Sequence, residues 1–417
     1  MSNQRPAADP FSLLQLLRDP GRVRDLQLHD WDALIRLARR ARLLGVLAHR
    51  IQSQAEHLAA VTDCVRGHLD SATIYSAHRV HLLRMELAAL ARVLPADVRV
   101  AVLKGGAYIL QDLVTARGRL PNDVDLLVSR DDLRRCEAAL LAAGWESEAV
   151  DDYADRYYRE WSHELPPLRF PGHPMEVDLH HTISPVTGRL RPDRALLFAD
   201  LQEVAGQRFL VLHPLDQILH AVIHLFQDSE LVDNLRDLVD IDSLLRTHLQ
   251  SNEDWLALTK RASRHGVERP LWYALHYCRL WLATPVPDGL PLRPPPVAMV
   301  RLMDWLYPRC TLPRLPDRSP TIARRIAVRL GLGKTSCFSR RESERKRERE
   351  RMASSSRRHI EDEYEWEEGE EKGGGGGGGE QVLCVFFSVS LLSLCFSFSF
   401  FSLYLSLVVS LSLSLSL

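Results

Sequence analysis

A short β-branched run followed by two glycines interrupts a chain whose neighbouring segments have helical periodicity. Residues 98–103 read Val-Arg-Val-Ala-Val-Leu and lead into Lys-Gly-Gly, after which residues 105–113 have a helical pattern. A basic loop follows, and a second strand begins with Asp123-Val-Asp125. Since side chains two residues apart in a strand face the same side, Asp123 and Asp125 point together. The sequence therefore predicts a sheet in which one strand carries two neighbouring carboxylates.

The two carboxylates need a partner of opposite charge. At about 4 Å and an effective dielectric constant of about 20, two such charges repel each other by roughly 4 kcal/mol. The pair should therefore either share a proton or hold a divalent cation. Oxygen ligands suit Mg²⁺, and a third carboxylate from a neighbouring strand would complete a site for two metal ions, as in phosphoryl transfer.

A later hairpin supplies two candidates for that third carboxylate. Residues 168–170 and 175–180 read as strands on either side of a Pro-Gly-His-Pro turn. Glu176 and Asp178 lie on the same face of the second strand, so either could serve. Asp178 is favoured because Glu176 lies nearer the turn, where side chains tend to be solvated.

The glycines and nearby basic residues suit an anionic ligand. Without a Cβ, Gly105 and Gly106 let the backbone approach a triphosphate, and the following helix offers free N–H groups at its N-terminus. Lys104 and Arg119 could add positive charge. His180 shares a face with Asp178 and could contact substrate, although a strand-end histidine that bonds to backbone is an equal alternative.

The flanking segments give the domain organisation. We expect an α+β protein with a small mixed-sheet core at residues 95–212, between an N-terminal helical region at 10–94 and a C-terminal helical region at 213–284. A proline-rich linker with short helices spans 285–334. A low-complexity tail occupies 335–417.

The tail differs in kind from the rest of the chain. Residues 341–351 largely alternate Glu with Arg or Lys, 373–379 are all glycine, and 396–417 are almost entirely Ser, Leu and Phe. Translated simple DNA repeats have this composition, so we expect residues 335–417 to lie outside the native fold. The alternative is a membrane anchor, because residues 382–417 contain no charged side chain and are long enough to span a bilayer.

Chain-wide features exclude several other classes. A net charge of -1 gives no clear nucleic-acid patch, and the seven cysteines form no CxxC pair. The N-terminus lacks the apolar region of a signal peptide, so a cytoplasmic protein is expected, with membrane association only if the tail is genuine.

Two further motifs lack a residue that the site they resemble requires. Residues 331–335, Gly-Leu-Gly-Lys-Thr, lack the glycine that a P-loop needs where Val328 stands. His220 and His224 have the spacing of two metal ligands on one helix face but lack the glutamate of a zinc protease. A packing or hydrogen-bonding role is favoured for both histidines.

Taken in order, these motifs resemble a known family. The motifs that carry the resemblance are Leu103-Lys104-Gly105-Gly106, Arg119, Asp123 to Val128, and Val177-Asp178-Leu179-His180. They are similar to the bacterial uncharacterised nucleotidyltransferase family of the polymerase-beta-like superfamily. The resemblance covers about residues 10–281, including a downstream helix at 215–245 with His220, His224, Asp237 and Asp240. The gap between Gly106 and Asp123 is longer than in many superfamily members.

The resemblance implies an enzyme that transfers a nucleoside monophosphate from an NTP, with ATP expected, to an unknown small-molecule or macromolecular acceptor. It implies Mg²⁺ as cofactor, with Asp123, Asp125 and Asp178 as catalytic metal ligands. The nucleotide would be bound by Lys104, Gly105, Gly106, Arg119 and His180. The alternative is a non-catalytic nucleotide-binding or regulatory module with the same fold.

Overall fold

The computed structural model describes residues 9–147, 158, 162–186, 190–227, 234–315 and 319–331. The chain divides into two compact units, Met1–Val328 and Arg329–Leu417. The low-complexity residues 335–417, expected to lie outside the native fold, fall outside the described residues.

One mixed sheet forms the centre of the first unit. Its strands are β1 (Ala101–Val102), β2 (Asp123–Leu127), β3 (Glu146–Ser147), β4 (Leu168–Arg169), β5 (Glu176–His180), β6 (Gln202–Glu203) and β7 (Leu210–Val211). Their order in the sheet is β3-β4-β5-β2-β1-β7-β6. Strands β2 and β5 run parallel, as do β1 and β7, whereas the remaining neighbours are antiparallel. The expected α+β class with a small mixed sheet is therefore confirmed.

Short helices connect these strands: α6 (Lys104–Leu110), the 3₁₀ turn η2 (Val114–Ala116), α7 (Leu133–Ala142) and α9 (Arg194–Ala199). The expected hairpin is also confirmed, because β4 pairs antiparallel with β5 through Leu168 and Val177. Helix α7 ends where the sequence predicts, and Gly144 follows it with a φ of 99°, which suits glycine. Helix α6 ends at Leu110 and not near 113, since Asp112 adopts a φ of 51°.

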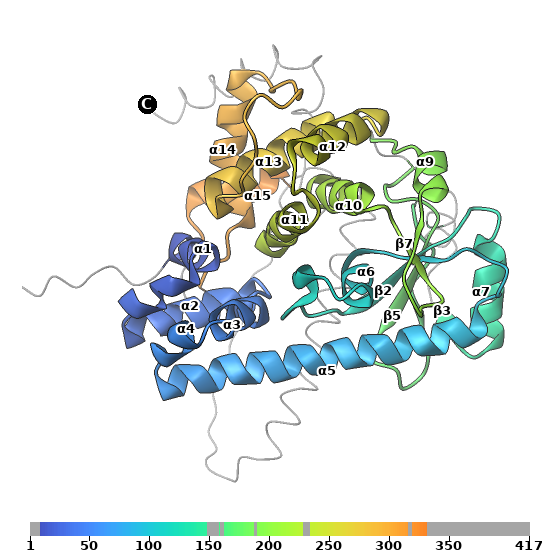
Figure 1. The fold of residues 1–417 in the computed structure, drawn as a ribbon, viewed down its shortest axis with the longest axis horizontal. Helices are drawn as coiled ribbons and strands as arrows, with labels where there is room; N and C mark the ends of the chain where they lie inside the picture. Colours follow the sequence, from blue (N-terminus) through green and yellow to red (C-terminus); the bar gives the residue numbers. More distant parts are fainter. Residues whose placement is uncertain are drawn as a thin grey trace, which may run out of the picture. The chain divides into compact units, whose positions relative to one another are not determined.

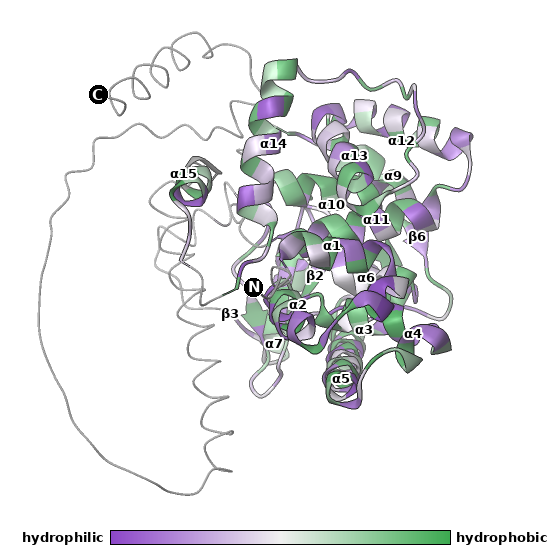
Figure 2. Cartoon of the chain, turned by 90° about the vertical axis from the view of Figure 1, so that its left-hand side faces the viewer, coloured by the Kyte–Doolittle hydropathy of each residue, from purple (hydrophilic) through white to green (hydrophobic). Residues whose placement is uncertain are grey.

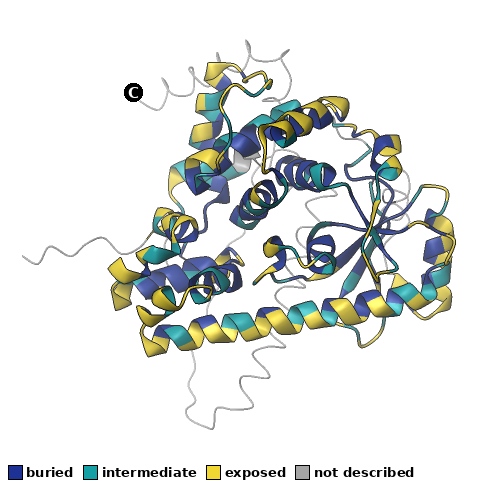
Figure 3. Cartoon of the chain, in the orientation of Figure 1, coloured by how far each residue is buried: buried dark blue, intermediate teal, exposed yellow. Residues whose placement is uncertain are grey.

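The N-terminal helices lead into the sheet through one long helix. They are α1 (Pro10–Arg18), α2 (Leu28–Arg40), α3 (Leu44–Gln52), α4 (Ala55–Ala59) and α5 (Asp63–Val93), with a 3₁₀ turn η1 at Pro20–Asp25. Helix α5 extends from α3 to the sheet, where it contacts β2, α6 and α7 (Figure 1). Its Leu83, Leu87 and Leu90 are buried, whereas its outer side is exposed (Figure 3). The apolar spacing therefore places one face of α5 against the core.

The C-terminal helices are α10 (Pro214–Gln227), α11 (Leu235–His248), α12 (Asn252–Arg264), α13 (Glu268–Leu282), α14 (Val297–Thr311) and α15 (Ile322–Gly331). The expectation of one helix at 215–245 is wrong, because α10 and α11 are separate helices. Figures 2 and 3 show α10 as mainly hydrophobic and buried, and its Ile218, Val222 and Leu225 are fully enclosed. None of the described helices combines the length and apolar character needed to cross a membrane.

A buried charge cluster fastens α10 to α12. Asp216 is completely buried and accepts hydrogen bonds from the Arg261 Nε, at 2.7 Å, and from Arg261 Nη2. His265 Nε2 lies 3.1 Å from the same carboxylate. Burial alone would raise the pKa of Asp216, but these partners lower it below its ordinary value. A buried charge is tolerated here because three nitrogen atoms, two of Arg261 and one of His265, lie within hydrogen-bonding distance of the carboxylate.

Candidate active site

The pairing of β2 with β5 brings two aspartates face to face. In this parallel pair Asp125 lies opposite Asp178, and Asp123 lies opposite Glu176. Because paired residues point to the same face of a sheet, all four carboxylates are on one face. They differ in exposure, since Asp125 is 4% exposed whereas Asp123 lies at the exposed start of the strand.

Helix α6 places a lysine on the first of these aspartates. Lys104 is its first residue and has a φ of 45°, a left-handed conformation that costs roughly 1–2 kcal/mol for a non-glycine residue. The Leu103 N–H donates to the Asp125 carbonyl at 2.9 Å, which fixes the strand end beside β2. Lys104 Nζ then reaches Asp125 Oδ1 at 2.8 Å. Burial would lower the pKa of Lys104, but Asp125 and Asp123 raise it, so the ammonium group remains charged.

The second partner of Asp125 is a histidine at the end of β5. His180 Nε2 lies 3.0 Å from Asp125 Oδ1, and its side chain is 1% exposed. Its other ring nitrogen, Nδ1, lies 3.3 Å from Glu164 Oε2. The backbones of Glu164 and His180 also pair in an isolated antiparallel β-bridge. Glu164 was not among the residues expected from the sequence. No motif surrounds it, so only the tertiary structure identifies it.

The two facing aspartates have opposite pKa shifts. Burial would raise the pKa of Asp125, but Lys104 and His180 together lower it well below its ordinary value. For Asp178, burial raises the pKa well above the usual range, and the charges of Glu164 and Asp125 raise it further. Among the described residues, the buried Asp178 Oδ1 has no hydrogen-bond partner. An unpaired carboxylate oxygen beside other acids needs a proton or a cation.

The donor set fits a divalent cation. Asp125 and Asp178 each offer a carboxylate oxygen, and these two atoms lie within 4.8 Å of each other and of one ring nitrogen of His180. Carboxylate oxygens are the ligands that Mg²⁺ prefers. Glu176, the rival third acid, instead bonds to Arg169 at 2.5 Å, on the side nearer the turn. The register thus places Asp178, and not Glu176, opposite Asp125.

The Gly-Gly pair has a packing reason within the protein. A Cβ on Gly105 would lie 1.7 Å from Arg119 Nη1, and one on Gly106 would lie 2.6 Å from Val102 Cγ1. Both glycines are buried in α6. The space that a side chain would occupy is therefore already filled by neighbours, and the glycines allow α6 to approach them.

Arg119 lies against α6 and forms a buried ion pair with Asp240. Its Nε donates to Asp240 Oδ2 at 2.9 Å, and its guanidinium lies 5.6 Å from the centre of the Tyr108 ring. The two charged side chains are only 9% and 7% exposed. Asp240 belongs to α11, so this pair connects the glycine helix of the core to the C-terminal helices. Arg119 therefore contacts both α6, through Tyr108, and α11, through Asp240.

The two histidines of α10 are also placed by the structure. His224 Nδ1 lies 3.2 Å from Asp237 Oδ2 of α11, which agrees with the favoured hydrogen-bonding role. His220 is buried, and burial followed by the charge of Lys104 lowers its pKa well below the ordinary value.

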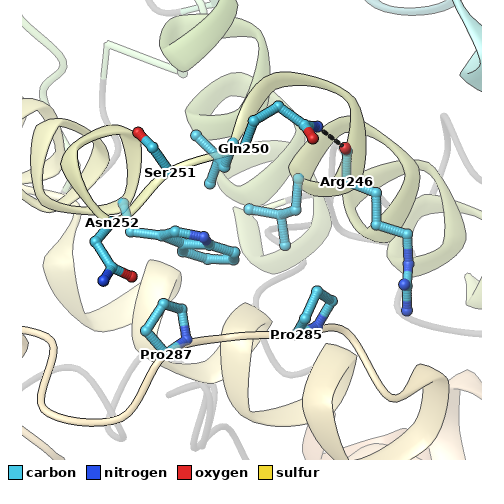
Figure 4. Close-up of a pocket in the computed structure, with 9 residues that line it drawn as sticks. Arg246, Gln250, Ser251, Asn252, Pro285 and Pro287 are labelled. Atoms are coloured by element: carbon cyan, nitrogen blue, oxygen red, sulfur yellow. Dashed lines mark hydrogen bonds between the residues drawn. The ribbon is translucent and has the colours of Figure 1, made fainter.

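A separate pocket lies away from these carboxylates. It is bordered by the end of α11, the start of α12 and the proline-rich segment, as Figure 4 shows for Arg246, Asn252 and Pro287. None of the residues that line it belongs to the carboxylate cluster.

An Asp-x-Asp strand that pairs in parallel with a second acidic strand, beside a Gly-Gly helix, is the arrangement of a nucleotidyltransferase-like α+β protein. The comparison with family models agrees, since the model of the family described as "Uncharacterised nucleotidyltransferase" matches residues 27–283, more than half of the chain. The chain belongs to this family.

No curated protein matches the sequence. A solved structure described as an antigenic nucleotidyltransferase-like protein from Paracoccidioides brasiliensis is 16% identical, over 50% of this chain and 96% of that one. Its TM-score is 0.24, which is too low for the likeness to carry an argument.

Proposed function

We propose that this protein is a Mg²⁺-dependent nucleotidyltransferase that transfers a nucleoside monophosphate from an NTP, most simply ATP, to a hydroxyl or similar group of an acceptor. Family membership supports the reaction class. The observation that carries the proposal is the in-register pair Asp125 and Asp178, in which one buried oxygen of Asp178 has no partner among the described residues.

Asp125, Asp178 and the exposed Asp123 would hold the cation, which when bound supplies positive charge to the phosphates of the nucleotide. Lys104 would add a second positive charge beside Asp125, and its contact with Asp125 at 2.8 Å supports this role. Gly105 and Gly106 allow α6 to pack closely against Arg119 and Val102. Arg119 in turn bonds to Asp240. His180 holds the Asp125 carboxylate in position.

Asp178 is proposed as the general base. Its Oδ1 makes no hydrogen bond within the described residues, so this oxygen is free to accept a proton. It would take the proton of the acceptor hydroxyl while that oxygen forms a bond to the α-phosphorus. The bond from the α-phosphorus to the bridging oxygen then breaks, and pyrophosphate leaves.

The test uses the full chain with each labelled NTP, Mg²⁺ and a cell extract as the source of acceptors. Label transfer and pyrophosphate release are expected with at least one NTP. Asp178→Asn should lower turnover by roughly 100-fold or more while nucleotide affinity changes little, because a general base acts on the chemical step. Asp125→Asn should abolish transfer.

Glu176→Gln is the matched control, since Glu176 lies on the same strand and face but bonds to Arg169. It should retain near-normal turnover. A silent Asp178→Asn beside an inactive Glu176→Gln would reverse the assignment of the third acid. Nucleotide binding without transfer for any NTP would favour the alternative, a non-catalytic nucleotide-binding module. Cytoplasmic location is likewise proposed, and cell fractionation would test it.

A further inference from the structure

A second group of potential ligands adjoins the carboxylates and has a different chemistry. His163, Glu164 and His180 each offer one ligand atom, and these atoms lie within 4.8 Å of one another. Two imidazole nitrogens and one carboxylate oxygen form a set typical of transition metals, whereas Mg²⁺ prefers oxygen alone.

The distances within this group suit a single ion. Glu164 Oε2 lies 3.5 Å from His163 Nε2 and 3.3 Å from His180 Nδ1, so one oxygen faces both rings. For zinc, metal-to-ligand distances are about 2.0–2.2 Å in tetrahedral geometry, which separates neighbouring ligand atoms by roughly 3.3–3.5 Å. The two ring centres are 5.2 Å apart, so both imidazoles can approach one point.

The hydrogen bonding of His180 points to a cation in the same place. Its Nε2 faces Asp125 Oδ1 at 3.0 Å and donates to that carboxylate. Its Nδ1 points toward the Glu164 carboxylate, whose Oε2 lies 3.3 Å away. Within the described residues Nδ1 makes no hydrogen bond, although the side chain is 1% exposed. Metal-bound histidines commonly donate their other N–H to a carboxylate in this way.

We propose that His163, Glu164 and His180 bind one divalent transition-metal ion of the zinc type, at a site distinct from the one formed by the aspartates. The ion completes the coordination of the buried His180 nitrogen. Because the other nitrogen of His180 bonds to Asp125, occupancy of this site also fixes the orientation of that carboxylate. The proposal does not depend on nucleotide transfer.

The experiment uses the full chain, stripped of metal with a chelator and titrated with Co²⁺ as a spectroscopic substitute for zinc. With excess Mg²⁺ present to occupy the aspartates, we expect one equivalent of Co²⁺ to bind with visible absorption typical of mixed nitrogen and oxygen ligands, and Zn²⁺ to displace it. His163→Gln and Glu164→Gln should each raise the Co²⁺ dissociation constant by about 100-fold or more, since loss even of an outer partner costs 10- to 100-fold. Both side chains are about a quarter exposed, at 26% and 25%, so the variants should fold.

Two controls separate this site from its surroundings. Asp123→Asn alters the aspartate cluster, and His29→Gln removes an exposed histidine of α2; both should keep the Co²⁺ spectrum and affinity. Circular dichroism of each variant checks the fold, and either ligand variant suffices if the other is unstable. The proposal is overturned if the full chain binds no Co²⁺, if binding survives both ligand variants, or if Asp123→Asn removes it equally. Co²⁺ binding in a chain that transfers no nucleotide would refute the proposed function and leave this site intact.

Discussion

Arg119 offers the sharpest test of whether the core and the C-terminal helices act as one unit. Arg119→Met removes the guanidinium from a pair whose N···O distance is 2.9 Å and whose side chains are 9% and 7% exposed. Asp240 would remain buried without its hydrogen-bonded partner, with Arg236 as a weaker positive neighbour, and Asp237 lies close enough to act on the same guanidinium. Breaking such a pair from one side costs about 3–5 kcal/mol.

The measurement is urea unfolding followed by circular dichroism, with the slope of the free energy against urea used to check that the unfolded state is unchanged. Arg117→Met is the matched control, because Arg117 pairs with Asp112 at 3.2 Å but both side chains are largely exposed, at 47% and 74%. An exposed pair contributes about 0–1 kcal/mol. The double variant Arg119→Met with Asp240→Leu should recover most of the lost stability, since an apolar pair replaces the buried charges.

If Arg119→Met and Arg117→Met lose equally little unfolding free energy, the Arg119–Asp240 pair does not stabilise the fold. Nucleotide affinity can be measured on the same variants. If Arg119→Met is stable but binds nucleotide much more weakly, Arg119 contacts the nucleotide directly, as the sequence predicts.

Three other outcomes are expected. The lowered pKa of buried Asp216 contributes stability that is present above about pH 4 and lost as the pH falls through the folded-state pKa, so Asp216→Asn should flatten the acid side of a stability-against-pH curve. If Asp216→Asn still loses stability steeply as the pH falls, this expectation is wrong. Gly45→Ala should destabilise by about 1–3 kcal/mol, because its Cβ would lie 2.3 Å from the Gly118 carbonyl oxygen. Gly67→Ala on α5 meets nothing within 4 Å and should stabilise by about 0.5–1 kcal/mol, and thermal melts that reverse this order would refute the packing argument. A chain ended at Leu330 should remain soluble with a cooperative melt, and loss of that transition would make the tail structural.

The local patterns of the sequence were informative because they depend on neighbouring residues alone. The period of two in β2 puts Asp123 and Asp125 on one face, and Gly144 ends α7 because only a residue tolerant of positive φ fits there. The Pro-Gly turn between β4 and β5 likewise predicts the hairpin. Such signals carry no information about which distant strand lies alongside.

Only the tertiary structure decided the composition of the site. The parallel register of β2 with β5 places Asp178 opposite Asp125 and Glu176 opposite Asp123, and a shift of one residue would have turned both acids of β5 to the other face. Glu164 lies beside His180 because the two residues form an isolated β-bridge, which no local sequence pattern predicts. Arg119, predicted from the sequence to add positive charge for the nucleotide, is buried and bonds to Asp240, 121 positions further along the chain. Side-chain partners of this kind follow from packing between segments remote in sequence, whereas periodicity reports only the face on which a residue lies.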